Sequence, residues 1–249
     1  MIANAGKFKA ILIRKDGAHT ENTPLIINSK EIASAAEVTL IGLQIDNKLN
    51  FNSYISKLCR KAANHLNALK RFRKYINNKD KKLLTNTYVL SQFNYCPIVW
   101  HFCGKGGIHM IEKIHERAIR FVTNDYTSEY LELLNKENDC TLYLRRVRLI
   151  AQEVYKSIHG LNPGYIKELL QNRRSNYPTR TPLNLYIPKV NQIKFGYRSY
   201  TFEAPSIWNS LPLEIRKASN FPMFKKLIKT WEGPSCRCNL CAYNDTEEV

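Results

Sequence analysis

A stretch that combines helical periodicity with one sign of charge most constrains how this chain can fold. Apolar residues recur close to every 3.6 positions from Tyr54 to Phe72. The same stretch has no acidic residue, and its basic residues are Lys57, Arg60, Lys61, Lys70, Arg71, Arg73 and Lys74. Because like charges on one helix repel, this charge does not serve folding. We expect an amphipathic helix whose charged face binds a polyanion, and nucleic acid is the commonest polyanion in cells.

The basic charge is concentrated rather than scattered. The 249 residues carry a formal charge of +17, and residues 51–124 alone hold fourteen Lys and Arg against three Asp and Glu. Anionic lipid is an alternative partner for such a surface. However, the sequence has no run of about 18 apolar residues, and the segment after Met1 is too polar for a signal peptide. We therefore expect an intracellular protein, cytoplasmic or nuclear, without a membrane partner.

The pattern along the chain predicts an α+β fold in four parts. These parts are 1–49, rich in strands; 50–125, helical and basic; 126–230, helical and mixed; and 231–249, a Cys-rich tail. We expect strands at 8–13, 25–27, 38–45 (broken at Gly42) and 195–202, and helices at 52–75, 78–96, 108–122, 129–134, 142–158 and 221–231. Gly104, Gly106 and Gly107 are expected to form a flexible link.

Three cysteines near the C-terminus have the spacing of metal ligands. Cys236, Cys238 and Cys241 form a C-x-C-x-x-C pattern, and zinc in proteins usually takes four ligands. The fourth could come from Cys140, from another chain, or from no residue at all. The sequence leaves a zinc knuckle and plain surface thiols as alternatives.

Other polar residues fit structural roles. His115 lies on the apolar stripe of its helix and is expected in the core. His101 and Cys103 are close in sequence, but no acid completes a nucleophile arrangement, so a Cys-His protease is not expected. The three tryptophans are expected to be packing anchors.

Several segments in order resemble non-LTR retrotransposon reverse transcriptases of the jockey-like group. The segments are Val38–Asp46 with Leu49-Asn50-Phe51, Asn67–Arg71, Ser91–Trp100, Ile114–Arg120 with Asn124-Asp125-Tyr126, Ile207–Pro212, and Trp231 with the three cysteines. The resemblance covers essentially the whole chain.

The resemblance implies a C-terminal part of a right-handed polymerase. Gly42 and Leu43 match the primer-grip hairpin, and residues 1–49 would be a remnant of the palm. Residues 50–125 would be a thumb that follows the template–primer duplex of RNA or DNA. Lys7 matches a lysine suggested to help pyrophosphate leave, so it is a candidate accessory residue.

The chain departs from the family at its catalytic centre. Polymerase chemistry needs carboxylates that hold two Mg²⁺ ions, and this sequence has no Asp-Asp pair. We therefore expect a nucleic-acid-binding fragment that is inactive alone, with Mg²⁺ belonging to the missing catalytic palm. The alternatives are a co-opted non-enzymatic RNA- or DNA-binding protein and an inert transposon relic.

Overall fold

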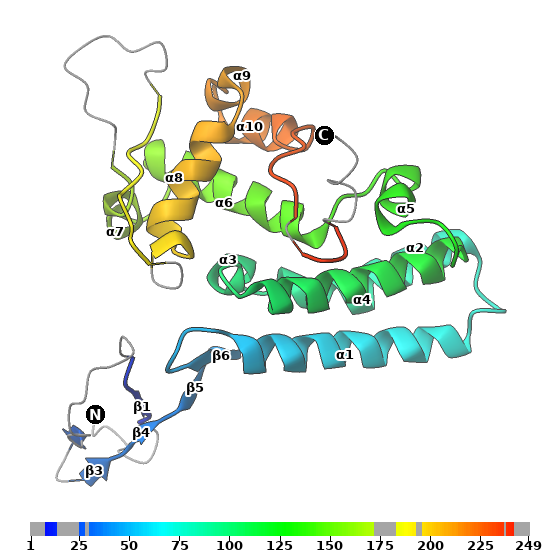
Figure 1. The fold of residues 1–249 in the computed structure, drawn as a ribbon, viewed down its shortest axis with the longest axis horizontal. Helices are drawn as coiled ribbons and strands as arrows, with labels where there is room; N and C mark the ends of the chain where they lie inside the picture. The colour runs from blue at the N-terminus through cyan, green and yellow to red at the C-terminus, as the bar shows by residue number, and fades with distance from the viewer. Residues whose placement is uncertain are drawn as a thin grey trace.

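The computed structural model describes residues 8–13, 25–27, 30–171, 183–192, 196–236 and 238–241. Helices predominate, and short strands lie at the N-terminal end (Figure 1). The predicted α+β class is confirmed, while the assignment of the strands to a polymerase palm stays a prediction. Lys7, the candidate accessory residue, lies outside the described residues.

The strands pair two by two. β1 (Ala10–Ile11) pairs in parallel with β4 (Ser34–Ala35), and β2 (Leu25–Ile27) pairs antiparallel with β3 (Lys30–Ile32). The segment 38–45, expected as a strand broken at Gly42, forms a hairpin of β5 (Glu37–Leu40) and β6 (Leu43–Asp46). Its turn is made by Ile41 and Gly42, whose φ angles are 47° and 81°. Two consecutive positive φ angles define the tight turn that matches strand twist in hairpins. Ile41 and Gly42 therefore reverse the direction of the chain.

The Asp46 side chain joins this hairpin to the first helix. Its carboxylate accepts the backbone N–H groups of Asn50 at 3.1 Å and Phe51 at 2.7 Å. Leu49 and Phe51 have left-handed backbones, with φ of 52° and 57°. The carboxylate therefore satisfies donors at the start of α1 that have no partner within the helix.

The helices follow most of the predicted pattern. Their bounds are α1 (Asn52–Arg71), α2 (Asn78–Leu84), α3 (Pro97–Trp100), α4 (Lys105–Thr123), α5 (Tyr130–Lys136), α6 (Leu142–Ile158), α7 (Gly164–Glu168), α8 (Tyr200–Ser210), α9 (Leu213–Arg216) and α10 (Phe221–Leu227). The helix expected over 78–96 changes after α2 to a π-helix, η2 (Thr85–Val89), and a 3₁₀-helix, η3 (Leu90–Asn94). Gly106 and Gly107 are not a flexible link, because they form the first turn of α4.

The first hydrophobic core lies where α4 packs along α1 (Figure 1). Ile55 and Leu66 of α1 and Ile111 of α4 are fully buried there. Gly107 allows the close approach, since a Cβ atom at that position would lie 3.2 Å from both Cys103 Sγ and Ile55 Cδ1. One face of α1 therefore packs on a hydrophobic core, as its apolar periodicity predicted.

The second core surrounds α6, which packs against α8 and α10. The predicted strand over 195–202 is wrong in its described part, because residues from Tyr200 onward form α8. The aromatic alternation there spans few residues. The longer helical spacing of Ala204, Ile207 and Trp208, all buried, decides the local structure.

The two cores meet along α6. Leu142 at its start belongs to the first core, and Val147 begins the second. No helix in the described part of the chain combines the length and apolar character needed to cross a bilayer.

Candidate nucleic-acid interface

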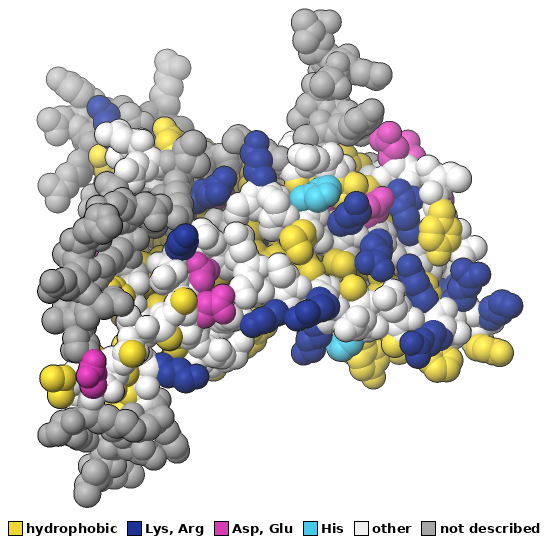
Figure 2. All heavy atoms as spheres, turned by 60° about the horizontal axis from the view of Figure 1, so that its bottom comes forward, with side chains coloured by type: hydrophobic (Ala, Val, Ile, Leu, Met, Phe, Trp, Pro, Cys, Tyr) yellow, Lys and Arg dark blue, Asp and Glu magenta, His cyan; other side chains and the backbone are white. Residues whose placement is uncertain are grey.

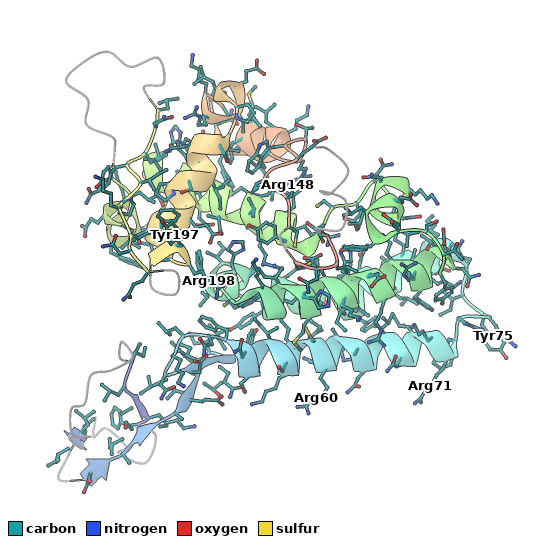
Figure 3. All side chains as sticks on the ribbon, in the orientation of Figure 1. Arg60, Arg71, Tyr75, Arg148, Tyr197 and Arg198 are labelled. Atoms are coloured by element: carbon teal, nitrogen blue, oxygen red, sulfur yellow. The ribbon has the colours of Figure 1, made fainter. Side chains whose placement is uncertain are left out.

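Most of the basic residues of α1 and of the turn after it are exposed to solvent. Arg60 and Arg71 point outward from the body of the protein (Figure 3). Six of the seven predicted residues are exposed, and Lys70 is half-buried; the exposed ones are Lys57, Arg60, Lys61, Arg71, Arg73 and Lys74. The structure thus places most of the predicted basic residues on an exposed face, whereas Lys70 is half-buried and interacts with Arg117 of α4.

This face is not neutralised by the protein itself. Within the described ranges, none of these seven side chains has a carboxylate oxygen within 4.0 Å. Lys57 instead donates a hydrogen bond to the amide oxygen of Gln44 at 2.7 Å. Figure 2 shows Lys and Arg side chains spread over this side with few acidic ones among them. The positive charge is therefore available to an external anion.

Arg117 of α4 extends the basic face beyond α1. Burial, followed by repulsion from Arg117 and Arg73, lowers the pKa of Lys70 below its usual value. Arg117 also donates a hydrogen bond to Asn67 Oδ1 at 3.3 Å. Arg117 is not among the basic residues predicted to bind nucleic acid, although its position beside the apolar stripe of α4 places it at the edge of the packed face. Two helices therefore contribute cations to one surface.

Two aromatic residues at the end of α1 are exposed rather than packed. Phe72, expected on the apolar stripe, is 57% exposed, and Tyr75 is 86% exposed. The helix ends at Arg71, so Phe72 no longer lies on the face that packs against α4. Aromatic rings among Arg71, Arg73 and Lys74 can stack on nucleic-acid bases.

The predicted hairpin residues have different environments. Gly42 is exposed at the turn, whereas the Leu43 side chain is 6% exposed and packs in the first core. The Tyr95 hydroxyl donates a hydrogen bond to the carbonyl oxygen of Ile41, which fixes the turn. Leu43 could therefore meet a ligand only through its backbone, and Gly42 is the accessible member of the pair.

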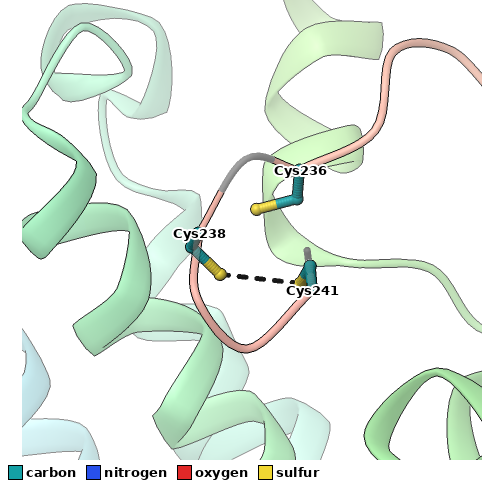
Figure 4. Close-up of side chains that lie close together, drawn as sticks. All are labelled: Cys236, Cys238 and Cys241. Atoms are coloured by element: carbon teal, nitrogen blue, oxygen red, sulfur yellow. Dashed lines mark hydrogen bonds between the residues drawn. The ribbon is translucent and has the colours of Figure 1, made fainter. Parts of the chain in front are cut away.

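The three C-terminal cysteines come together in the structure (Figure 4). Their sulfur atoms all lie within 4.8 Å of one another, and Cys238 Sγ is 3.6 Å from Cys241 Sγ. Cys236 and Cys238 are buried and Cys241 is half-buried. The alternative of plain surface thiols therefore does not describe this cluster.

The arrangement favours one thiolate in the cluster. Side-chain hydrogen bonding with Cys236 and Cys241 lowers the pKa of Cys238, whereas hydrogen bonding with Cys236 and Cys238 raises the pKa of Cys241. Thiolates are the form of cysteine that binds metals. Sulfur ligands about 2.3 Å from a tetrahedral ion lie about 3.8 Å apart, so the observed spacing is compatible with a metal ion.

The described residues offer no fourth ligand beside these three. Cys140, the internal candidate, is not part of the group; its sulfur accepts a hydrogen bond from Arg148 Nη1 at 3.4 Å. Arg148 also donates to the Trp231 carbonyl oxygen at 2.6 Å through Nη2 and so anchors the segment that leads to the cysteines. A complete tetrahedral set would need a water molecule or a group from another molecule.

His115 lies in the core, as the sequence predicted. His115 is buried, and its Nδ1 lies 2.8 Å from the Tyr130 hydroxyl oxygen. Burial raises the pKa of the Cys103 thiol to about 11, so it is not an activated nucleophile despite its closeness to His101. The expectation that no acid accompanies this pair is wrong, because Glu203 Oε1 lies 3.5 Å from His101 Nε2.

Comparisons with known proteins do not assign a family: no family model, curated protein or solved structure matches the chain.

Proposed function

We propose that this chain is the nucleic-acid-binding C-terminal part of a retrotransposon reverse transcriptase, with α1 and its neighbours acting as a thumb that holds a template–primer duplex. The observation that carries the proposal is the unneutralised basic face of α1, extended by Arg117. The resemblance of several ordered sequence segments supports the assignment to this family of polymerases. Nucleic acid is an intracellular partner, so the proposal places the protein in the cytoplasm or nucleus.

The geometry suits a grip that does not depend on sequence. Lysine and arginine bind phosphate through charge and release condensed counterions, and such contacts carry no base code. α1 has 20 residues, which gives a length of about 30 Å. Cations along such a helix can contact successive phosphates while the duplex moves past.

The same proposal limits the chemistry of the chain. It contains no Asp-Asp pair, so the carboxylates that hold Mg²⁺ in a polymerase are not supplied by these residues. A non-enzymatic RNA- or DNA-binding protein is the second candidate function, and the same observation favours it. Both candidates require duplex or strand binding by the isolated chain.

We further propose that Cys236, Cys238 and Cys241 bind zinc. Three sulfur atoms at mutual distances below 4.8 Å, two of them on buried residues, support this assignment. A bound ion would add to the few core contacts of the tail and hold it against α5. Leu240 and Cys241 already pack there beside Leu133 and Leu134.

The duplex grip is tested by measuring affinity for a labelled RNA–DNA duplex as salt is raised. Replacing Lys57, Arg60 and Lys61 together by Ala should weaken binding. It should also flatten the slope of log K against log salt by roughly 0.9 for each phosphate that the variant no longer neutralises. The matched control replaces three exposed lysines of the C-terminal half, Lys217, Lys226 and Lys229, and therefore removes the same charge.

Two results would overturn the proposal. One is affinity that is insensitive to salt, and the other is an equal loss of affinity in the control. Template-dependent nucleotide incorporation by the purified chain with Mg²⁺ would contradict its inactivity alone.

A further inference from the structure

A cavity of about 520 Å³ lies between the first and second hydrophobic cores. None of the seven basic residues of α1 and its following turn lines it. Its walls come from the segment between α3 and α4, from α6, and from α8 with the residues just before it. This volume is within the range of about 300–1,000 Å³ that is typical of small-molecule sites, and boundaries between structural units commonly hold such sites.

One side of the cavity is suited to an anion. Lys105, the first residue of α4, lines it together with Arg198. Gly104 caps the start of this helix without a side-chain hydrogen bond, and the first turn carries no acid. A Cβ atom on Gly104 would lie 3.5 Å from Arg198 Nη1, so the guanidinium lies beside the helix start. Free N–H groups at a helix N-terminus, with two adjacent cations, form a phosphate site.

The remaining walls are aromatic. Phe102 and Tyr143 are half-buried, and Tyr197 is 48% exposed and packs edge-on against Phe202 with 4.7 Å between the ring centroids. Tyr197 and Arg198 both lie just before α8 and line the cavity (Figure 3). Flat rings next to an anion site are suited to a planar ligand that carries a phosphate.

A buried polar group in the cavity wall has no partner among the described residues. His101 lines the cavity and is only 2% exposed, yet its Nδ1 has no hydrogen bond; its Nε2 lies 3.5 Å from Glu203. Buried polar atoms are nearly always hydrogen-bonded. His101 Nδ1 is covered by its neighbours, so a ligand in the cavity reaches it only if those side chains shift.

Arg146 adds positive charge behind the aromatic wall. It is 2% exposed, its guanidinium makes no hydrogen bond within the described part, and it lies 5.9 Å from the Tyr143 ring centroid. Glu203 is the one carboxylate among the lining residues, and it faces His101. Positive charge therefore exceeds negative charge around the cavity.

We propose that this cavity binds a nucleoside 5′-phosphate, with the phosphate at the start of α4 between Lys105 and Arg198 and the base against the aromatic walls. The nucleotide can be free or an unpaired residue of a single strand. The second source depends on the proposed nucleic-acid-binding function, whereas the cavity itself does not.

The test is calorimetric titration of the full chain with adenosine 5′-monophosphate, compared with adenosine and with inorganic phosphate. Saturable binding of the nucleotide, at least tenfold tighter than either part, is expected. Arg198→Ala should weaken it about tenfold, because one hydrogen bond between charged groups is removed. The control, Lys217→Ala, removes an exposed cation elsewhere in the C-terminal half and should bind as the wild type does. Lack of saturable binding, or equal binding by Arg198→Ala, would overturn the proposal.

A second arm identifies the source of the nucleotide. Weaker single-strand binding by Arg198→Ala and Tyr197→Ala, with duplex affinity unchanged, supports a nucleotide within a strand. Unchanged strand affinity together with weaker nucleotide binding supports a free nucleotide. The α1 triple variant should keep its nucleotide affinity. A loss of duplex binding can therefore be distinguished from a loss of nucleotide binding in the cavity.

Discussion

The carboxylate of Glu112 accepts a hydrogen bond from the Tyr130 hydroxyl at 2.8 Å, and both side chains are buried. The same carboxylate accepts the backbone N–H groups of Leu142 at 3.1 Å and Tyr143 at 2.7 Å. Glu112 belongs to α4, Tyr130 to α5, and the two N–H groups to the start of α6. One buried acid therefore joins three helices, and its charge is favourable at a helix N-terminus.

Glu112→Ala should destabilise the protein by about 3 kcal/mol, because it leaves a buried hydroxyl and two buried N–H groups without an acceptor. Chemical denaturation monitored by circular dichroism measures the change. Tyr130→Phe is the comparison variant: it removes one of the three hydrogen bonds to Glu112 together with the contact between the Tyr130 hydroxyl and His115 Nδ1, and should cost about 2 kcal/mol. Equal stability of Glu112→Ala and the wild type would show that the carboxylate does not join these helices.

Asp46→Ala should loosen the connection between the hairpin and α1. The expected loss is about 1–3 kcal/mol, because the backbone N–H groups of Asn50 and Phe51 lose a charged acceptor. Amide hydrogen exchange should become faster at residues 47–52 while the middle of α1 stays protected. Asp46→Asn keeps one acceptor oxygen, so its free energy of unfolding should lie between those of the wild type and Asp46→Ala. Uniform acceleration along α1 would contradict a local role.

The sequence predicted the helices well where the apolar period is long. The stripe of α1 places Ile55 and Leu66 in the core, and the bounds of α6 agree with the predicted 142–158. The error over 195–202 came from a short aromatic alternation that competed with a helical spacing continuing to Trp208. Burial in the second core then favoured the helix. In such short segments, tertiary packing determines the secondary structure more strongly than the local sequence pattern does.

The candidate sites were predictable only where one segment carries them. The basic residues of α1 and the three cysteines are close in sequence, so their clustering could be predicted. The cavity has both Lys105 and Arg198 in its wall. These residues are distant in sequence and come together only when α4 and α8 both pack against α6. Nothing in the spacing of those residues indicates such a contact.

Cys238→Ser should reduce the zinc content of the purified protein. The wild type is expected to hold one zinc ion per chain by elemental analysis, and a chelator should lower its Tm because the bound ion stabilises the folded state. Cys140→Ser is the matched control and should keep its zinc, since Cys140 lies outside the group of three sulfur atoms. Zinc-free wild-type protein that is indifferent to chelator would contradict the assignment.

Protonation of His101 should destabilise the fold in mild acid. Burial, which outweighs the opposing effect of Glu203, lowers the pKa of His101 below its usual 6.5; Arg146 lowers it further. The folded state therefore binds this proton less readily than the unfolded chain does. The resulting stability is complete above about pH 7 and is lost as the pH falls through about 6.5 toward the folded pKa.

The free energy of unfolding, measured from about pH 7.5 to pH 5, should therefore fall more steeply in the wild type than in His101→Gln. The difference in slope should be at most about 1.4 kcal/mol per pH unit, the value for one proton. Comparing His101→Gln with the wild type cancels the contributions of the other titrating groups to the pH dependence. Those facing His101 include Glu203, Arg146, Cys103, Lys105 and Arg198. Parallel pH profiles would show that His101 is not held neutral by its surroundings.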